Sequence, residues 1–186
     1  MDHHFNLLLE RLATALDAAA MPYMVIGGQA VIQYGEARFT QDIDLTLGVG
    51  VDDWRGGDAV LQSIGLVPRV RDYEDVAEKG HILLLLDPHS SIPVDVSLCG
   101  SPMEQAALAR VTRHMVGVAN VAFASVEDLL IQKIFAGREH GHDDVRRILR
   151  KQKKFDAAYV EDWLRRLGPA FDRDLLGDFR SLAPRR

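Results

Sequence analysis

Two aspartates, Asp42 and Asp44, lie one residue apart in the stretch QDIDLTL, which otherwise has the pattern of a buried β-strand. Successive side chains of a strand face opposite sides, so both carboxylates share one face while Ile43 and Leu45 share the other. The carboxylates are then about 6–7 Å apart and repel each other unless a cation lies near them. The pair therefore predicts a divalent-metal site.

A third aspartate, Asp95, occurs in the stretch IPVDVSL with the same alternation of apolar and polar residues. If the two strands are neighbours, Asp42, Asp44 and Asp95 converge on one place. Three carboxylates suit one or two Mg²⁺ ions that are bound through oxygen and shared with substrate phosphates. We expect Mg²⁺ as the cofactor, with Mn²⁺ as the alternative.

A glycine pair, Gly27-Gly28, follows a short strand and precedes a helix. A strand that runs into glycines and then a helix presents backbone N–H groups at the positive end of the helix dipole, which favours phosphate binding. The chain contains neither the GxxxxGK[ST] motif of a P-loop nor the GxGxxG motif of a dinucleotide fold. The sequence thus predicts a different kind of phosphate-binding site.

The elements that must position these residues follow from apolar periodicity and turn residues. We expect helices over residues 3–20, from the glycine pair to Tyr34, and over 52–64, 125–136, 142–153, 157–167 and 170–181. We expect strands over residues 23–26, around the aspartates, and over 67–71, 81–87 and 92–98, the last two forming a hairpin. Strands come first and helices last, which predicts an α+β core over residues 1–124 and a helical region over 125–186.

Composition excludes several classes of protein. The 186 residues include 47% apolar and 26% charged side chains, which is typical of a globular domain. Cys99 is the only cysteine, so an internal disulfide is excluded. No apolar run approaches the roughly 20 residues of a membrane helix, and the N-terminus lacks the layout of a signal peptide, so we expect a cytoplasmic protein. A net charge of −5 argues against nonspecific coating of nucleic acid.

The order of these motifs resembles the DNA polymerase beta-type nucleotidyltransferase superfamily. Within it, the stretches ARFTQDIDL and EDLLIQKIFAGREHGHDDVRRIL resemble the AbiEii-like and MenA-like nucleotidyltransferases, many of which are toxins of toxin–antitoxin systems. The resemblance implies a mixed sheet flanked by helices, with a C-terminal helical region. It also implies that Asp42, Asp44 and Asp95 bind metal and act in catalysis.

The resemblance further implies a reaction in which a nucleoside monophosphate passes from an NTP to an acceptor hydroxyl and pyrophosphate leaves. Gly27, Gly28, Arg38 and Thr40 are then expected to bind the nucleotide, as are Lys133 and Asp144, with Lys133 also in catalysis. The implied acceptor is the 3′ end of tRNA or a protein, and the implied partner is a cognate antitoxin. The chain departs from many relatives in having Gly141 three residues before Asp144.

Other interpretations stay open at this stage. The same fold could be a nucleotide-binding or protein-interaction module without turnover, or it could modify an aminoglycoside. Lys133 on its helix is also compatible with a solvated lysine beside an apolar stripe. Residues 145–154, VRRILRKQKK, carry six basic side chains and no acid, which indicates either a solvated helix face or a contact with RNA.

Overall fold

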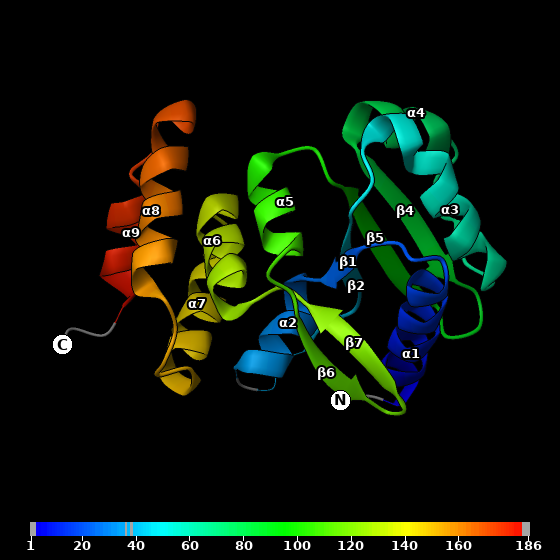
Figure 1. Cartoon of the computed structure of the whole chain (residues 1–186), viewed down its shortest axis with the longest axis horizontal. Helices are drawn as coiled ribbons and strands as arrows, with labels where there is room; N and C mark the ends of the chain where they lie inside the picture. Colours follow the sequence, from blue (N-terminus) through cyan, green and yellow to red (C-terminus); the bar gives the residue numbers. More distant parts are fainter. Residues whose placement is uncertain (1–2, 36, 38, 184–186) are drawn as a thin grey trace. The chain divides into compact units, whose positions relative to one another are not determined.

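A computed structural model describes residues 3–35, 37 and 39–183 (Figure 1). Its α-helices are α1 (His3–Ala18), α2 (Gly27–Tyr34), α3 (Trp54–Ser63), α4 (Tyr73–Gly80), α5 (Pro102–Leu108), α6 (Val126–Ala136), α7 (Glu139–Lys151), α8 (Ala157–Leu167) and α9 (Leu175–Leu182). Its strands are β1 (Tyr23–Val25), β2 (Ile43–Leu47), β3 (Val67–Pro68), β4 (Ile82–Asp87), β5 (Ile92–Leu98), β6 (Thr112–Val116) and β7 (Ala119–Phe123). Two short 3₁₀ helices, η1 (Val51–Asp53) and η2 (Gly168–Phe171), precede α3 and follow α8. The predicted α+β class is confirmed.

The described strands form one seven-stranded sheet in the order β3-β4-β5-β2-β1-β7-β6. The pairs β2–β5 and β1–β7 are parallel, and the other neighbours are antiparallel. This mixed sheet places β2, which carries Asp44, beside β5, which carries Asp95, although β3, α4 and β4 separate the two strands along the chain. The predicted β4–β5 hairpin is confirmed.

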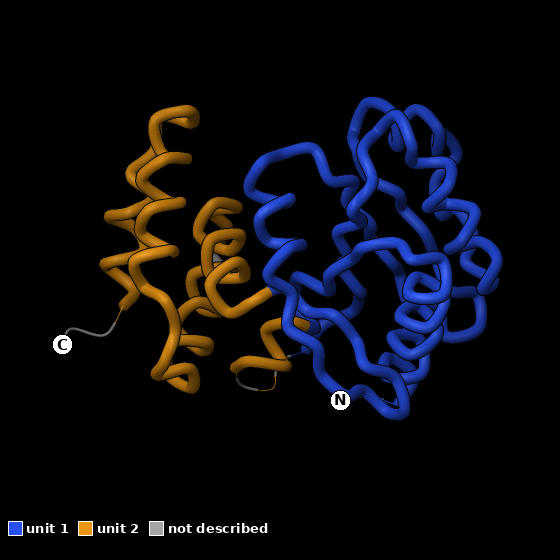
Figure 2. The backbone as a smooth tube through the Cα atoms, in the orientation of Figure 1, with its two compact units in different colours: residues 1–29, 39–124 blue, residues 30–38, 125–186 orange. Residues whose placement is uncertain are grey.

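The chain divides into two compact units (Figure 2). Unit 1 consists of residues 1–29 and 39–124 and holds the sheet with α1, α3, α4 and α5. Unit 2 consists of residues 30–38 and 125–186 and holds α6 to α9 with the end of α2. Each unit has a buried apolar core of its own. Among the described residues, no helix is both long and apolar enough to cross a membrane.

In unit 1, helix α1 forms because apolar residues recur at helical spacing. Leu8, Leu9, Leu12 and Leu16 are fully buried, and the helix ends before Pro22, which cannot continue it. In unit 2, the same periodicity buries Leu130 and Ile134 of α6, Ile148 of α7 and Leu164 of α8. A capping interaction starts α6, because the Ser125 hydroxyl accepts a hydrogen bond from the Asp128 amide at 3.1 Å.

The turn between β4 and β5 depends on a buried carboxylate. Asp87 ends β4 with 2% of its surface exposed, and its oxygens accept hydrogen bonds from the Ser90 hydroxyl at 2.6 Å and from Arg11 at 3.2 Å. Burial alone raises the pKa of Asp87, but the Ser90 hydroxyl and the Arg11 guanidinium outweigh it, so the pKa lies below its usual range. These contacts fix the hairpin that presents Asp95.

Several elements differ from the sequence prediction. The strand expected over residues 67–71 covers only Val67–Pro68, because it lies at the sheet edge and proline donates no ladder hydrogen bond. Helices α4 and α5 and the β6–β7 hairpin were not predicted. Strand β6 is the other edge, and most of its side chains are at least partly exposed, so it lacks the apolar alternation that marks a strand.

Candidate active site

Asp44 and Asp95 lie side by side on neighbouring strands. The parallel register of β2 and β5 pairs Asp44 with Asp95 directly. Residues paired in this way point to the same face of a sheet, and the strand axes are about 4.8 Å apart. Both side chains are half-buried. The condition for convergence, that the two strands are neighbours, is therefore met.

The glycine turn between β1 and α2 touches the same place. Gly27 has φ +60°, and a Cβ built on it would lie 1.8 Å from Oδ2 of Asp44. The Ile26 amide donates a hydrogen bond to the Asp44 carbonyl at 2.9 Å. Only glycine tolerates both this backbone conformation and this contact. The first turn of α2 thus begins directly against the Asp44 carboxylate, while Gly28 is buried as the second residue of the helix.

Asp42 lies immediately before β2 and is held by a local contact. The Thr40 hydroxyl donates a hydrogen bond to Oδ1 of Asp42 at 2.9 Å. Thr40 is nearly buried, with 9% of its surface exposed, whereas Asp42 is half-buried. Thr40, which we expected to bind nucleotide, therefore orients one of the predicted metal-binding carboxylates.

Asp95 is paired with an arginine that the sequence analysis missed. Nη2 of Arg69 lies 2.6 Å from Oδ1 of Asp95, and the two side chains are 32% and 24% exposed. Arg69 directly follows the edge strand β3, and its amide donates to the Leu84 carbonyl at 3.0 Å. No motif marks Arg69, because the residue reaches Asp95 only through the pairing of β3, β4 and β5.

The donors at this place suit a hard divalent cation. Within the described residues, no three side chains of His, Cys, Asp or Glu are arranged to hold one metal ion together. The available groups are carboxylate oxygens, and a guanidinium cation already rests on Asp95. Mg²⁺ typically takes one or two carboxylates and completes its shell with water and substrate phosphates. The residues therefore fit Mg²⁺ bound jointly with a nucleotide, rather than a complete protein cage.

Lys133 and Asp144, expected from the resemblance, form a buried ion pair within unit 2. Nζ of Lys133 on α6 lies 2.9 Å from Oδ2 of Asp144 on α7, and the side chains are 17% and 4% exposed. The structure thus joins two residues that the sequence analysis treated separately. The alternative of a solvated lysine is wrong for Lys133. The pair belongs to unit 2, whereas Asp42, Asp44 and Asp95 belong to unit 1.

Gly141 explains a departure from the family pattern. It is buried in the first turns of α7, and a Cβ built on it would lie 3.1 Å from the Lys133 carbonyl oxygen. An acidic side chain at this position would require α6 and α7 to separate slightly. Helices α6 and α7 therefore lie close together at Gly141, and the Lys133–Asp144 ion pair joins the same two helices. Arg38, the remaining expected nucleotide-binding residue, lies outside the described residues.

A family model for the nucleotidyl transferase AbiEii toxin of type IV toxin–antitoxin systems matches residues 8–183. The chain belongs to this family. The resemblance noted in the sequence is therefore confirmed, and the protein is a nucleotidyltransferase of the AbiEii toxin family. None of the curated proteins compared with the chain matches it.

Solved structures agree with this fold. An antigenic nucleotidyltransferase-like protein from Paracoccidioides brasiliensis is 18% identical, with a TM-score of 0.53, and the match covers 97% of this chain and 94% of that one. The antibiotic-resistance factor ANT(2'')-Ia is 17% identical, with a TM-score of 0.55 and the same two coverages. A crystal structure of ANT(2'')-Ia with adenylyl-2''-tobramycin is 18% identical, with a TM-score of 0.50, and the match covers 96% and 98%. These likenesses support the nucleotidyltransferase fold alone.

Membership of the AbiEii family implies a substrate, a type of cofactor and a partner. An enzyme of this family takes an NTP as substrate, and such enzymes typically use a divalent metal. A toxin of a toxin–antitoxin system has an antitoxin as its partner.

Proposed function

We propose that this AbiEii-family chain transfers a nucleoside monophosphate from an NTP to an acceptor hydroxyl at the face of the sheet that carries Asp44 and Asp95. The observation that carries this proposal is the in-register pairing of Asp44 with Asp95 directly beside Gly27. Carboxylates and a glycine turn at a helix start meet two needs of the reaction, cation binding and phosphate binding.

The chain's own residues would divide the work as follows. Asp42, Asp44 and Asp95 would each supply carboxylate oxygens to one of two Mg²⁺ ions, or Mn²⁺ in their place, with no ion taking all three carboxylates; when bound, these ions offset the charge of the triphosphate. The amides at the start of α2 would bind phosphate oxygens. The acceptor oxygen attacks the α-phosphorus and forms a new P–O bond. The bond between the α-phosphorus and the oxygen that bridges the α- and β-phosphates breaks, and pyrophosphate leaves. Asp95 would accept the proton of the acceptor hydroxyl.

Lys133 would supply positive charge to the leaving pyrophosphate, and Asp144 would hold it in position. The 2.9 Å contact and the near-complete burial of Asp144 support this positioning role. A lysine held by one buried carboxylate loses little conformational freedom when a phosphate arrives, which favours binding. Arg38 is proposed as a further cation for the triphosphate. The acceptor is proposed to be the 3′ end of tRNA, with a protein hydroxyl as the alternative.

Transfer of radiolabel tests the proposal. The protein is incubated with each α-labelled NTP and Mg²⁺ or Mn²⁺, in separate arms with total tRNA, cell protein or a panel of aminoglycosides. Asp44→Asn keeps the shape of the side chain against Gly27 but removes its charge. We expect it to lower transfer by at least about 100-fold, since metal assistance is worth several kcal/mol.

Glu78→Gln provides the matched control, because Glu78 is an exposed carboxylate of unit 1 that pairs with Arg55 at 3.2 Å and lines none of the pockets described below. Label transfer that survives Asp44→Asn as well as Glu78→Gln would refute the metal role of Asp44. Absence of transfer in every arm would instead favour a nucleotide-binding module without turnover.

The aminoglycoside arm is included because unit 1 has an acidic pocket. A pocket of about 500 Å³ has a lining that includes four acids and one cation, namely Asp58, Asp72, Glu74, Asp75 and Arg71, together with Trp54 and Tyr73. Such a lining suits a cationic sugar better than an RNA backbone. Arg55 offsets part of this charge through its pair with Glu74 at 3.0 Å, so RNA remains the preferred acceptor. Label that enters only the aminoglycosides would reverse that preference.

A further inference from the structure

The basic residues of α7 and the segment after it form a stripe on unit 2. Arg146 and Arg150 are four residues apart on α7 and so share one face of the helix. Lys153 follows the end of the helix and lines the same pocket as these two arginines. Val145 and Ile148 are fully buried on the opposite side. We call Arg146, Arg150 and Lys153 the basic stripe. It belongs to a run of six basic residues without an acid.

The basic stripe borders a small pocket. The pocket has a volume of about 210 Å³, and its lining consists of the basic stripe together with Leu149 and Leu182. None of these lining residues is acidic. Three cations around an apolar floor favour an oxyanion over a neutral or cationic ligand.

A larger pocket adjoins this one, because the two share Leu149 and Lys153. It has a volume of about 610 Å³, and its lining includes Phe155, Phe179 and Arg180. Phe155 is half-buried and is one of the residues that line this pocket. Cations beside an aromatic surface are the combination with which proteins bind single-stranded nucleic acid, because phosphates contact the cations and bases stack on the rings.

An acidic neighbour of Arg146 and the acid of the larger pocket are both accounted for by ion pairs that solvent reaches. Arg146 pairs with Asp143 at 2.8 Å, but both side chains are at least half exposed, so solvent screens the pair. Glu161, the acid in the larger pocket, is engaged by Arg180 at 2.6 Å. Over the whole of unit 2, 15 lysines and arginines stand against 12 aspartates and glutamates, a formal charge of +3. In unit 1 the counts are 7 and 15, a formal charge of −8.

We infer that the groove formed by these two pockets binds a single RNA strand, with backbone phosphates on the basic stripe and a base against Phe155. This inference rests on the proposed function, because it supplies the acceptor RNA of that reaction. The formal charge of +3 on unit 2 favours it, because a positively charged surface attracts a polyanion. An acidic partner protein is the competing occupant.

Binding of a fluorescein-labelled single-stranded RNA, measured by anisotropy without NTP or metal, tests the inference. Each phosphate contact adds about 0.7 to the slope of log affinity against log salt. Arg146→Gln/Arg150→Gln/Lys153→Gln is therefore expected to reduce that slope by about 2 and to weaken binding about 100-fold at 0.1 M salt. Phe155→Leu is expected to weaken binding at least about fivefold, because it removes the stacking ring.

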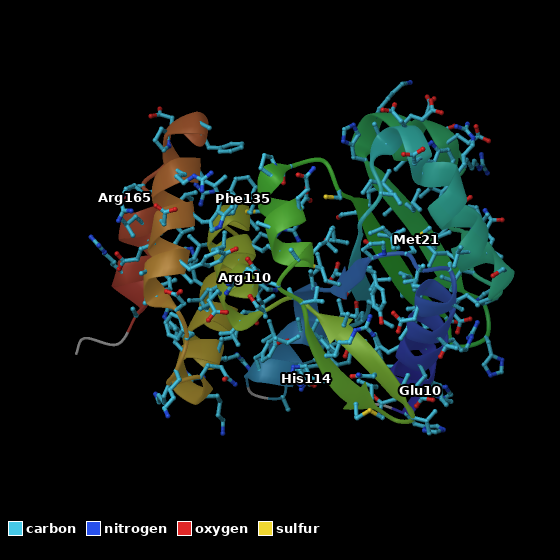
Figure 3. All side chains as sticks on the ribbon, viewed as in Figure 1. Glu10, Met21, Arg110, His114, Phe135 and Arg165 are labelled. Carbon is cyan, nitrogen blue, oxygen red and sulfur yellow. The ribbon has the colours of Figure 1, made fainter. Side chains whose placement is uncertain are left out.

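The control variant Lys79→Gln/Arg165→Gln/Arg166→Gln removes the same number of exposed positive charges away from the groove; Arg165, on α8, is labelled in Figure 3. It should leave RNA binding within about twofold, and thermal melts should show both triple variants folded. Equal weakening in the two triple variants, or polyglutamate that competes with RNA at equal charge, would overturn the inference. If the protein binds RNA but transfers label to no acceptor, the RNA-binding inference is supported and the proposed function is refuted. If it transfers label to protein but binds no RNA, the proposed function is supported and the RNA-binding inference is refuted.

Discussion

The two units hold their polar functional groups in opposite ways. In unit 1, Asp44 and Asp95 stand half-exposed on a sheet, and their neighbours are a glycine turn and the partly exposed Arg69. In unit 2, Lys133 and Asp144 are buried against each other between two helices. A half-buried acid pair that solvent can reach contributes little to stability, whereas a buried ion pair is costly to break. Under the proposed function, the acid pair of unit 1 would bind the metal, and the buried pair of unit 2 would hold Lys133 in one position.

Breaking the buried pair should have the largest effect on stability. Lys133→Met removes the ammonium group that lies 2.9 Å from the buried Asp144 carboxylate, so we expect the free energy of unfolding to fall by about 3–5 kcal/mol. Urea denaturation followed by circular dichroism measures this. The double variant Lys133→Met/Asp144→Leu should recover most of the loss, because an apolar pair of similar volume replaces the ions. A single variant that loses less than about 1 kcal/mol would show that the pair is not a buried structural link.

Gly27→Ala tests whether the glycine turn beside Asp44 in unit 1 is part of the active site. The new Cβ must displace the Asp44 carboxylate, and the left-handed backbone costs a non-glycine residue about 1–2 kcal/mol. We expect a stability loss of that size together with a loss of nucleotidyl transfer that matches Asp44→Asn. Gly56→Ala on α3 is the control, since nothing lies within 4 Å of its Cβ, and it should stabilise the protein by about 0.5–1 kcal/mol. Full transfer activity in Gly27→Ala would separate this turn from the active site.

Removal of Arg69 is expected to have the smallest effect of the three substitutions, and to be a gain in metal affinity where the other two are losses of stability. Arg69→Ala frees Asp95 from its ion pair, so Mn²⁺ should bind more tightly by up to about fivefold, the equivalent of an exposed pair worth at most about 1 kcal/mol. Titration of Mn²⁺ followed by electron paramagnetic resonance, without NTP, gives the affinity. Arg71→Ala removes the same charge two residues away and should change it less. Weaker Mn²⁺ binding in Arg69→Ala would mean that Arg69 holds Asp95 in its binding position.

Much of the candidate site could be predicted from the sequence, because the patterns that mark it involve residues close together along the chain. The parity of Asp44 and Asp95 depends only on alternation along a strand, and the helix after Gly27 depends only on neighbouring residues. The β6–β7 hairpin was missed, because an exposed edge strand carries no apolar alternation. Arg69 was missed for another reason. Its partner Asp95 is 26 residues away, and no short pattern encodes that contact.

By itself, the sequence determined the α+β class, the family and the identity of the acidic residues, because these follow from local periodicity and from motifs of a few residues. Tertiary structure alone decided that β2 and β5 are parallel neighbours in register, that Gly27 abuts Asp44, and that Lys133 pairs with Asp144. Strand order and helix packing depend on burying apolar faces that are distant along the chain. Their free energy belongs to the assembled core and not to any one segment.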